Sequence, residues 1–253
     1  MTGWSMIQLA LLGAAGLVGG FVNTLAGGGS LVTLPALLLL GLPADVANAT
    51  NRVGVLAQSV VAARGLGRDS RLAATAKARV LVPALAGALV GAWIAARTPP
   101  AALKPILLAT LVLIAFLMAW KPNLVLAGAD DVPLDPRERP FGVAGLFLIG
   151  AYGGFLQVGV GILLLLFLGG VLRYDLLLGN ALKSLLVAAL TVVALVVFVL
   201  EGKVQWLPGL LMSVAMVAGA RLGVRFARAR GQDAIRKVLF VAVLASCIAA
   251  ALR

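Results

Sequence analysis

The sequence Gly16-Leu-Val-Gly-Gly-Phe-Val-Asn-Thr-Leu-Ala-Gly-Gly-Gly-Ser30 places three consecutive glycines between two apolar segments. The segment before the glycines, residues 5–26, is long enough to cross a bilayer as a helix. The segment after them, residues 29–41, would extend only about 20 Å as a helix, against a hydrocarbon core of about 30 Å. This pattern predicts a transmembrane helix followed by a short helix, which is either a full crossing or half of a re-entrant pair.

The rest of the chain is equally apolar. Apolar residues make up 62% of the 253 residues and charged residues 12%, whereas soluble domains have about 45–50% and about 25%. Ten apolar runs can be distinguished, at roughly 5–26, 29–41, 45–63, 79–97, 102–120, 141–158, 160–172, 175–200, 205–227 and 234–252. We therefore predict an all-helical integral membrane protein. Its first repeat would occupy residues 1–120, a polar linker 121–140, and its second repeat 141–253.

Composition also excludes several classes of function. The chain contains no His and one Cys, so a histidine-based triad, histidine ligation of zinc and an internal disulfide are all impossible. The net charge of +12 would suit a nucleic-acid-binding protein, but most of the cations lie between the apolar runs. We expect no nucleic-acid partner, no cofactor, no metal and no enzymatic activity.

The two groups of five runs resemble each other. Short motifs recur in the same order at offsets of 134 or 132 residues, which indicates a duplicated unit. The matching pairs are Gly19-Gly20-Phe21 with Gly153-Gly154-Phe155, Asn48-Ala49 with Asn180-Ala181, and Gly87 and Gly91 with Gly219 and Gly223.

Loop charge predicts how each unit is oriented. The loop after the third run carries five cations between Arg64 and Arg79, so we expect it to be cytoplasmic. Its counterpart in the second half carries Lys203 beside Glu201 and is expected outside. Equivalent loops on opposite sides are typical of the inverted-topology repeats of secondary transporters.

The glycine-rich breaks are candidate binding elements. Short, glycine-interrupted segments at corresponding positions in two halves point to a transporter's central site, and helix N-termini there attract anions. The candidate residues at these breaks are Asn23, Thr24, Gly28, Gly29 and Ser30 in the first half, and Gln157 and Gly161 in the second. The alternative is that these glycines only allow helices to pack closely.

Two cations lie within apolar runs. Arg52 follows Asn48-Ala-Thr50-Asn51, and Lys183 lies within Asn180-Ala-Leu-Lys183-Ser184. A central Arg or Lys costs about 2.5–3.5 kcal/mol on insertion scales, and no Asp or Glu lies deep in the runs to neutralise it. We expect an anion from solution to complete the site. The uncharged candidate residues are Asn48, Thr50, Asn51, Asn180 and Ser184.

The alternative for these cations is that they snorkel to an interface or pair with Asp45 and Asp175. Those two acids begin the third and eighth runs, and we interpret both as N-caps.

Residues 16–30, followed by Pro35, Gly41-Leu-Pro43 and Ala47-Asn-Ala-Thr50-Asn-Arg52, resemble the TauE/SafE family of sulfite exporters. The second half departs from this pattern, since Leu182 stands where a Thr would match Thr50, and Lys183 adds a charge. The resemblance implies a bacterial membrane permease for small sulfur-containing anions, such as sulfite, sulfoacetate or other organosulfonates.

We therefore predict a secondary transporter, acting as an exporter, in the bacterial inner membrane. It would move the anion by alternating access at a site between the two repeats. Its expected partners are the small anion and the lipid bilayer, and the sequence leaves open whether it forms a homodimer. Two alternatives stay open: an anion channel with the same pore lining, and a non-transporting membrane partner protein.

Overall fold

The computed structural model describes residues 4–67, 74–120 and 133–251, and within these ranges it contains helices and no strand. The predicted all-helical fold is therefore confirmed for the described residues. In chain order the elements are α1 (Met6–Ala26), α2 (Ser30–Leu39), α3 (Ala44–Leu66), α4 (Ala74–Arg97), α5 (Pro100–Trp120), the 3-10 helix η2 (Pro136–Glu138), α6 (Gly142–Phe155), α7 (Val160–Gly170), α8 (Leu176–Leu200) and α9 (Trp206–Ala251).

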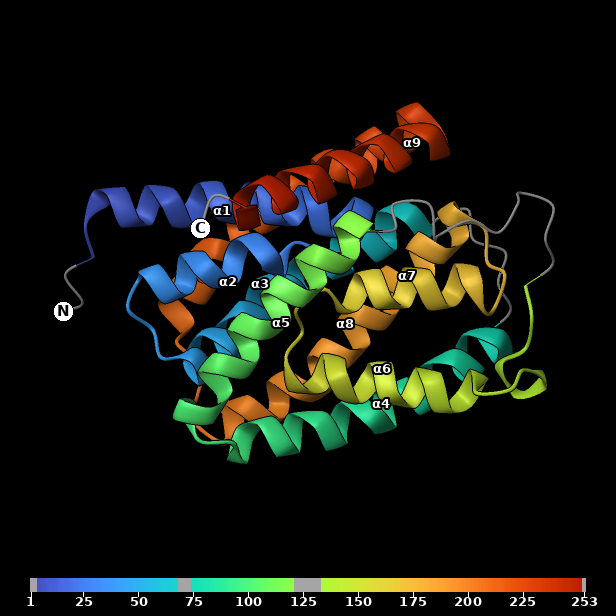
Figure 1. Ribbon diagram of the computed structural model, residues 1–253, viewed down its shortest axis with the longest axis horizontal. Coiled ribbons are helices and arrows are strands. Elements are labelled where there is room, and N and C mark those ends of the chain that lie inside the picture. The colour runs from blue at the N-terminus through green and yellow to red at the C-terminus, as the bar shows by residue number, and fades with distance from the viewer. Residues whose placement is uncertain (1–3, 68–73, 121–132, 252–253) are drawn as a thin grey trace.

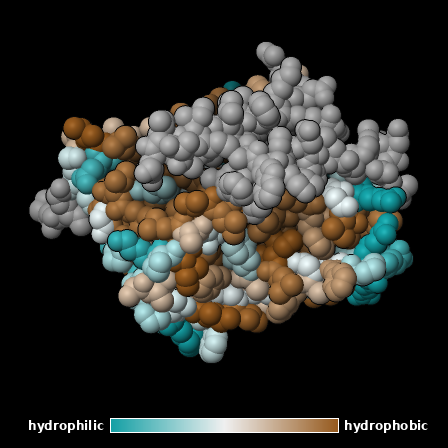
Figure 2. Space-filling view, in the orientation of Figure 1, coloured by the Kyte–Doolittle hydropathy of each residue, from teal (hydrophilic) through white to brown (hydrophobic). Residues whose placement is uncertain are grey.

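Several of these helices are long and apolar enough to cross a membrane. They are α1, α8, Lys77–Arg97 of α4 and Trp206–Ala229 of α9. Large apolar side chains stay exposed on them, including Val214 at 74% and Leu200 at 81%. Figure 2 shows apolar residues over the middle of the visible face and hydrophilic residues towards the two ends of the long axis. This belt is what a protein surrounded by lipid requires.

The two short helices, α2 and α7, are too short to span the membrane. Since α2 has 10 residues and α7 has 11, each is about 15–17 Å long, half the thickness of the hydrocarbon core. The choice left open by the sequence is settled in favour of half-helices. In Figure 1 the α1–α2 pair begins and ends at the left of the molecule, and the α6–α7 pair begins and ends at the right.

The C-terminal region differs from our prediction. We expected the runs at 205–227 and 234–252 to be separate segments, but α9 is helical throughout Trp206–Ala251. Residues 228–237, around the expected break between these runs, contain no proline and are mostly Arg, Ala, Lys and Gln. These residues favour helix, and the single Gly231 costs only about 1 kcal/mol.

Part of the predicted polar linker is ordered against the helices. Asp135 caps η2 by accepting the backbone N–H of Arg137, and it also pairs with Arg79 of α4. The N–H of Arg137, together with the positive charge of Arg79, holds the pKa of the Asp135 carboxyl below its usual value. Residues 121–132 of the predicted linker lie outside the described residues.

Glycines allow helices of the two halves to pack closely on one another. A Cβ atom added at Gly20 of α1 would lie 2.1 Å from the carbonyl oxygen of Met216 in α9. A Cβ at Gly150 of α6 would lie equally close, at 2.1 Å, to the carbonyl oxygen of Ala84 in α4. The first helix of each half thus packs on the fourth helix of the other half, backbone against backbone.

These contacts correct the register of the duplication. Gly219 packs on the carbonyl oxygen of Leu17, and Gly87 packs in the same way on that of Phe147. Phe147 lies 130 residues after Leu17. The first helices therefore correspond at 130 and not at the 134 expected from the Gly-Gly-Phe motif, which is one helical turn away. The offset of 132 between Gly87 and Gly219 is unchanged.

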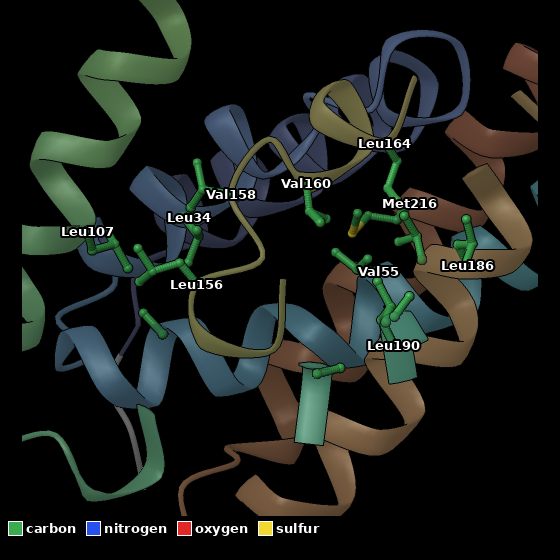
Figure 3. Close-up of a cluster of buried hydrophobic side chains, with 14 of the residues drawn as sticks. Leu34, Val55, Leu107, Leu156, Val158, Val160, Leu164, Leu186, Leu190 and Met216 are labelled. Atoms are coloured by element: carbon green, nitrogen blue, oxygen red, sulfur yellow. The ribbon is translucent and has the colours of Figure 1, made fainter. Parts of the chain in front are cut away.

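The apolar core surrounds the second helix break. In Figure 3 the side chains of Leu34, Leu164, Leu186 and Met216, from α2, α7, α8 and α9, lie around the segment that joins α6 to α7. All four are fully buried. This packing holds the irregular backbone of the break inside protein, where a membrane protein can tolerate it.

Candidate functional site

The two helix breaks meet at the centre of the molecule. α1 ends at Gly27, which has a left-handed conformation with φ of 82°. The break after α6 passes through Gln157 and Gly159, with φ of 65° and 63°. A Cβ atom on Gly27 would lie 2.6 Å from Cα of Gly161, so the two backbones touch. Gly161, one of the candidate residues predicted at the breaks, therefore allows the two backbones to approach each other closely.

Arg52 of α3 binds the end of α6. Its guanidinium donates to the carbonyl oxygens of Gly153 at 3.0 Å and Gly154 at 2.6 Å, and to Oε1 of Gln157 at 2.6 Å. The side chain is 0% exposed and lies over the ring of Phe198, 4.9 Å from its centroid. A cation of the first half therefore caps a broken helix of the second half.

Lys183 of α8 makes the reciprocal contact. Its Nζ donates to the carbonyl oxygens of Asn23 at 2.9 Å and Thr24 at 3.1 Å, near the end of α1. It is 2% exposed. Each half thus places its buried cation on the C-terminus of the other half's first helix. A helix C-terminus has unpaired carbonyls and a partial negative charge, which attract cations.

The predicted asparagines complete both caps. Nδ2 of Asn48 donates to the carbonyl oxygen of Phe155 at 2.8 Å, and Nδ2 of Asn180 donates to that of Leu25 at 3.3 Å. Their amide oxygens, however, are buried without a hydrogen-bond partner. At each break one cation and one amide therefore bind consecutive carbonyls, and each amide keeps one free acceptor.

Asn51 holds the start of α2. It donates to the hydroxyl of Ser30 at 3.1 Å and accepts from the hydroxyl of Thr33 at 2.6 Å. The backbone N–H of Gly29 donates to Oδ1 of Asn23 at 3.3 Å. The predicted first-half residues are thus brought together, although their groups largely bind one another.

Other predicted residues lie away from this centre or bind locally. Thr50 accepts the backbone N–H of Gln205 at 3.0 Å, next to the α8–α9 turn. Ser184 donates to the carbonyl of Asn180 in its own helix. Thr24 donates to the carbonyl of Gly20, also in its own helix, and Gly28 accepts the N–H of Leu31.

Sequence reasoning missed several buried polar residues. Nε2 of Gln157 donates to Thr191 at 2.9 Å, and Thr24 donates to Gln58 at 3.4 Å, which in turn donates to Ser59 at 2.7 Å. The signal was the repeat itself, since Thr191 follows Ser59 by 132 residues.

The two acids have different roles. Asp175 accepts the N–H groups of Leu177 and Leu178, both at 2.9 Å, so the N-cap prediction is confirmed there. For Asp45 the prediction is wrong. Pro43 is the N-cap of α3, and Asp45 in the first turn pairs with Lys203 at 3.1 Å. The dipole favours an acid in the first turn as well as at the cap.

The centre therefore carries uncompensated positive charge. No ion pair in the described part of the chain includes Arg52 or Lys183. Each helix C-terminus contributes about half a negative charge, which the N-termini of α2 and α7 offset. Nε of Arg52 is buried and has no acceptor. Such a centre suits a small anion. Among the described residues no group of three or more His, Cys, Asp or Glu side chains could hold a metal.

The fold and this centre define an all-helical membrane protein with two broken helices around buried cations, the class of structure expected of a transporter. Comparison with known families agrees. The family described as "Sulfite exporter TauE/SafE" matches residues 12–250, and the chain belongs to this family.

Curated relatives carry transporter names. The chain is 32% identical to "Probable membrane transporter protein ORF9" of Sinorhizobium sp over 95% of this chain and 91% of that protein. It is 28% identical to "Probable membrane transporter protein YfcA" of Escherichia coli K12 over 94% and 87%. A "Probable membrane transporter protein" of Haemophilus influenzae is 25% identical over 92% and 90%. No solved structure matches the chain. The protein is a membrane transporter.

Proposed function

We propose that the protein is a secondary transporter that exports small sulfur-containing anions, such as sulfite or organosulfonates, across the bacterial inner membrane. The observation that carries this proposal is the pair of buried cations, Arg52 and Lys183, which have no acidic partner among the described residues. Two unneutralised charges at membrane depth are costly. An anionic substrate would supply the missing negative charge.

In this proposal the anion binds beside the two helix breaks. Arg52 presents its unpartnered Nε, and Lys183 supplies a second positive charge. Arginine can hold two oxygens of an oxyanion, whereas lysine acts as a compact point charge. Both cations also bind carbonyl groups, so binding would require them to share or exchange these acceptors.

The substrate class follows from the family. Its description names sulfite, and sulfite and sulfonates are oxyanions that a guanidinium can bind with paired hydrogen bonds. The residues at the centre select for a small anion, and the family membership favours one that contains sulfur.

Alternating access between two inverted repeats is the proposed mechanism. Two observations support it. The first helix of each half packs on the fourth helix of the other half. In Figure 1 the α1–α2 pair begins and ends at the left of the molecule, and the α6–α7 pair begins and ends at the right. Rocking of one repeat against the other would expose a fixed central site to each side in turn.

The test is counterflow in proteoliposomes. Vesicles loaded with unlabelled sulfite should take up labelled external sulfite transiently above equilibrium, and organosulfonates should compete better than chloride or sulfate. Uptake that only equilibrates, without counterflow, would indicate a channel. Folded protein that moves none of these anions would contradict the proposed function.

A further inference from the structure

A pocket of about 210 Å³ lies between the end of α3, the start of α4 and the start of α8. Two of its lining residues are cations, Arg64 from α3 and Lys77 from α4. Neither forms an ion pair with a described residue. Its α8 wall consists of Ala181, Leu182 and Leu185, which flank the buried Lys183.

The repeat gives this pocket a counterpart. Adding the offset of 132 to Lys77 leads to Gly209, and subtracting it from Leu182 and Leu185 leads to Thr50 and Val53. The equivalent place therefore lies between the starts of α3 and α9 and the end of α8.

This counterpart is closely packed. A Cβ atom added at Gly209 would lie 3.2 Å from Cβ of Val53 and 3.3 Å from Cγ2 of Thr50, so α9 is packed tightly on α3. Equivalent surfaces of the two halves thus enclose a pocket at one end of the molecule and are in close contact at the other.

Polar contacts hold the α8–α9 turn in place at this closely packed counterpart, which we call the closed end. The backbone N–H of Gln205 donates to the Thr50 hydroxyl at 3.0 Å, and Lys203 pairs with Asp45 at 3.1 Å. Glu201 lies 3.8 Å from Arg97 at the end of α4. The first two contacts fix the α8–α9 turn over the start of α3, and the third joins it to the end of α4.

The two ends also differ in charge. Arg64 and Lys77 stand at the open pocket, whereas Val196 and Gly209 take their places at the closed end. Cations lining a concave surface raise the local concentration of anions. Only the open pocket is therefore built to collect an anion.

We propose that the pocket between α3, α4 and α8 is an anion-binding vestibule, through which the substrate reaches the central site. Its counterpart under the α8–α9 turn is the opposite mouth, closed in this conformation and opened when the pocket closes. This inference rests on the proposed function and adds to it the two mouths and the side on which the anion is collected.

Neutralising the vestibule tests the binding role. With sulfite as the probe, Arg64→Ala and Lys77→Ala should each raise the KM for counterflow about 5-fold or more with little change in kcat, and Arg64→Lys should restore most of the affinity. Lys104→Ala, at an exposed cation of α5, is the matched control. An unchanged KM in both alanine variants would overturn the vestibule while leaving the transporter assignment intact.

Accessibility tests the two mouths without depending on flux. In a Cys247→Ser background, Leu185→Cys and Val53→Cys place single thiols at equivalent positions in the open and closed ends. A membrane-impermeant thiol reagent should modify Leu185→Cys, more slowly when sulfoacetate is present, and should leave Val53→Cys unmodified. Adding Lys203→Ala should make Val53→Cys reactive.

Two outcomes contradict the inference. Equal reactivity at positions 185 and 53 would show that the ends do not differ. Failure of sulfoacetate to slow modification of Leu185→Cys, in vesicles where sulfoacetate competes in counterflow, would show that the anion does not pass this pocket. Absence of counterflow with intact variants would instead contradict the proposed function.

Discussion

Arg52 and Lys183 show how a membrane protein can bury cations without acids. Each binds the carbonyl groups that a broken helix leaves unpaired, and each reaches across to the other half of the chain. Helix C-termini offer partial negative charge and free acceptors together. This arrangement lowers the cost of burial but leaves a net positive centre, where we propose that the substrate binds.

Arg52 consequently has a structural role as well as a proposed binding role. Arg52→Ala would leave the carbonyls of Gly153 and Gly154 and the amide of Gln157 without their donor. Each buried unsatisfied group costs about 1–3 kcal/mol, so we expect a destabilisation of about 3 kcal/mol or more. Thermal unfolding in detergent would measure it, with Lys104→Ala, at an exposed cation of α5, as the control. Equal melting temperatures for the two variants would contradict the capping role.

Arg52→Lys separates the two roles. Lysine keeps the charge and can reach carbonyl groups, but it lacks the second terminal nitrogen and the Nε–H donor of arginine. We expect the stability to recover by more than half and the KM for sulfite to stay raised about 10-fold or more. Wild-type KM in this variant would show that the guanidinium geometry does not contribute to anion binding.

At the scale of helices, close approach depends on a few glycines. Gly20→Ala would force a methyl group into the carbonyl of Met216 and separate α1 from α9, at a cost of about 1–3 kcal/mol. Gly150→Ala should do the same between α6 and α4. Gly13→Ala is the control in the same helix as Gly20, since nothing lies within 4 Å of its added Cβ. It should be neutral or stabilising. Thermal unfolding compares the three, and a Gly20→Ala variant as stable as Gly13→Ala would be inconsistent with this interface.

The half-helix α2 depends on one side chain of α3. Asn51→Ala removes the bonds to Ser30 and Thr33, each worth about 1 kcal/mol. We expect about 2 kcal/mol of lost stability and faster hydrogen exchange confined to α2. Thr110→Ala, which removes a single exposed hydrogen bond within α5, is the comparison. Exchange that is unchanged in α2 would mean that apolar packing alone holds it.

At the scale of the whole molecule, the missing acids determine how transport responds to voltage. Because no carboxylate among the described residues pairs with Arg52 or Lys183, the simplest cycle moves the anion alone. An inside-negative potential then favours its exit by about 2.3 kcal/mol per charge per 100 mV. Sulfite efflux from proteoliposomes should accelerate when a potassium diffusion potential makes the lumen negative. Insensitivity to voltage would indicate that the anion carries a proton with it.

The sequence by itself determined the membrane class, the glycine breaks, the short helices and the duplication, because hydrophobic runs, glycine clusters and repeated motifs are local in the chain. It also identified the residues of the centre, since an Arg, a Lys and four Asn in apolar runs stand out by their cost.

Tertiary structure alone decided what those residues bind. Arg52 is separated from Gly153 by 101 positions and Lys183 from Asn23 by 160, and no local pattern specifies backbone acceptors so far along the chain. The same holds for the 130-residue register of the first helices, which helix-on-helix contact fixes, and for Asp45, whose partner Lys203 comes from the α8–α9 turn. Which end is closely packed is likewise decided by tertiary contacts, because the equivalent residues Leu185 and Val53 have different surroundings: Leu185 lines a pocket, whereas Val53 packs against Gly209.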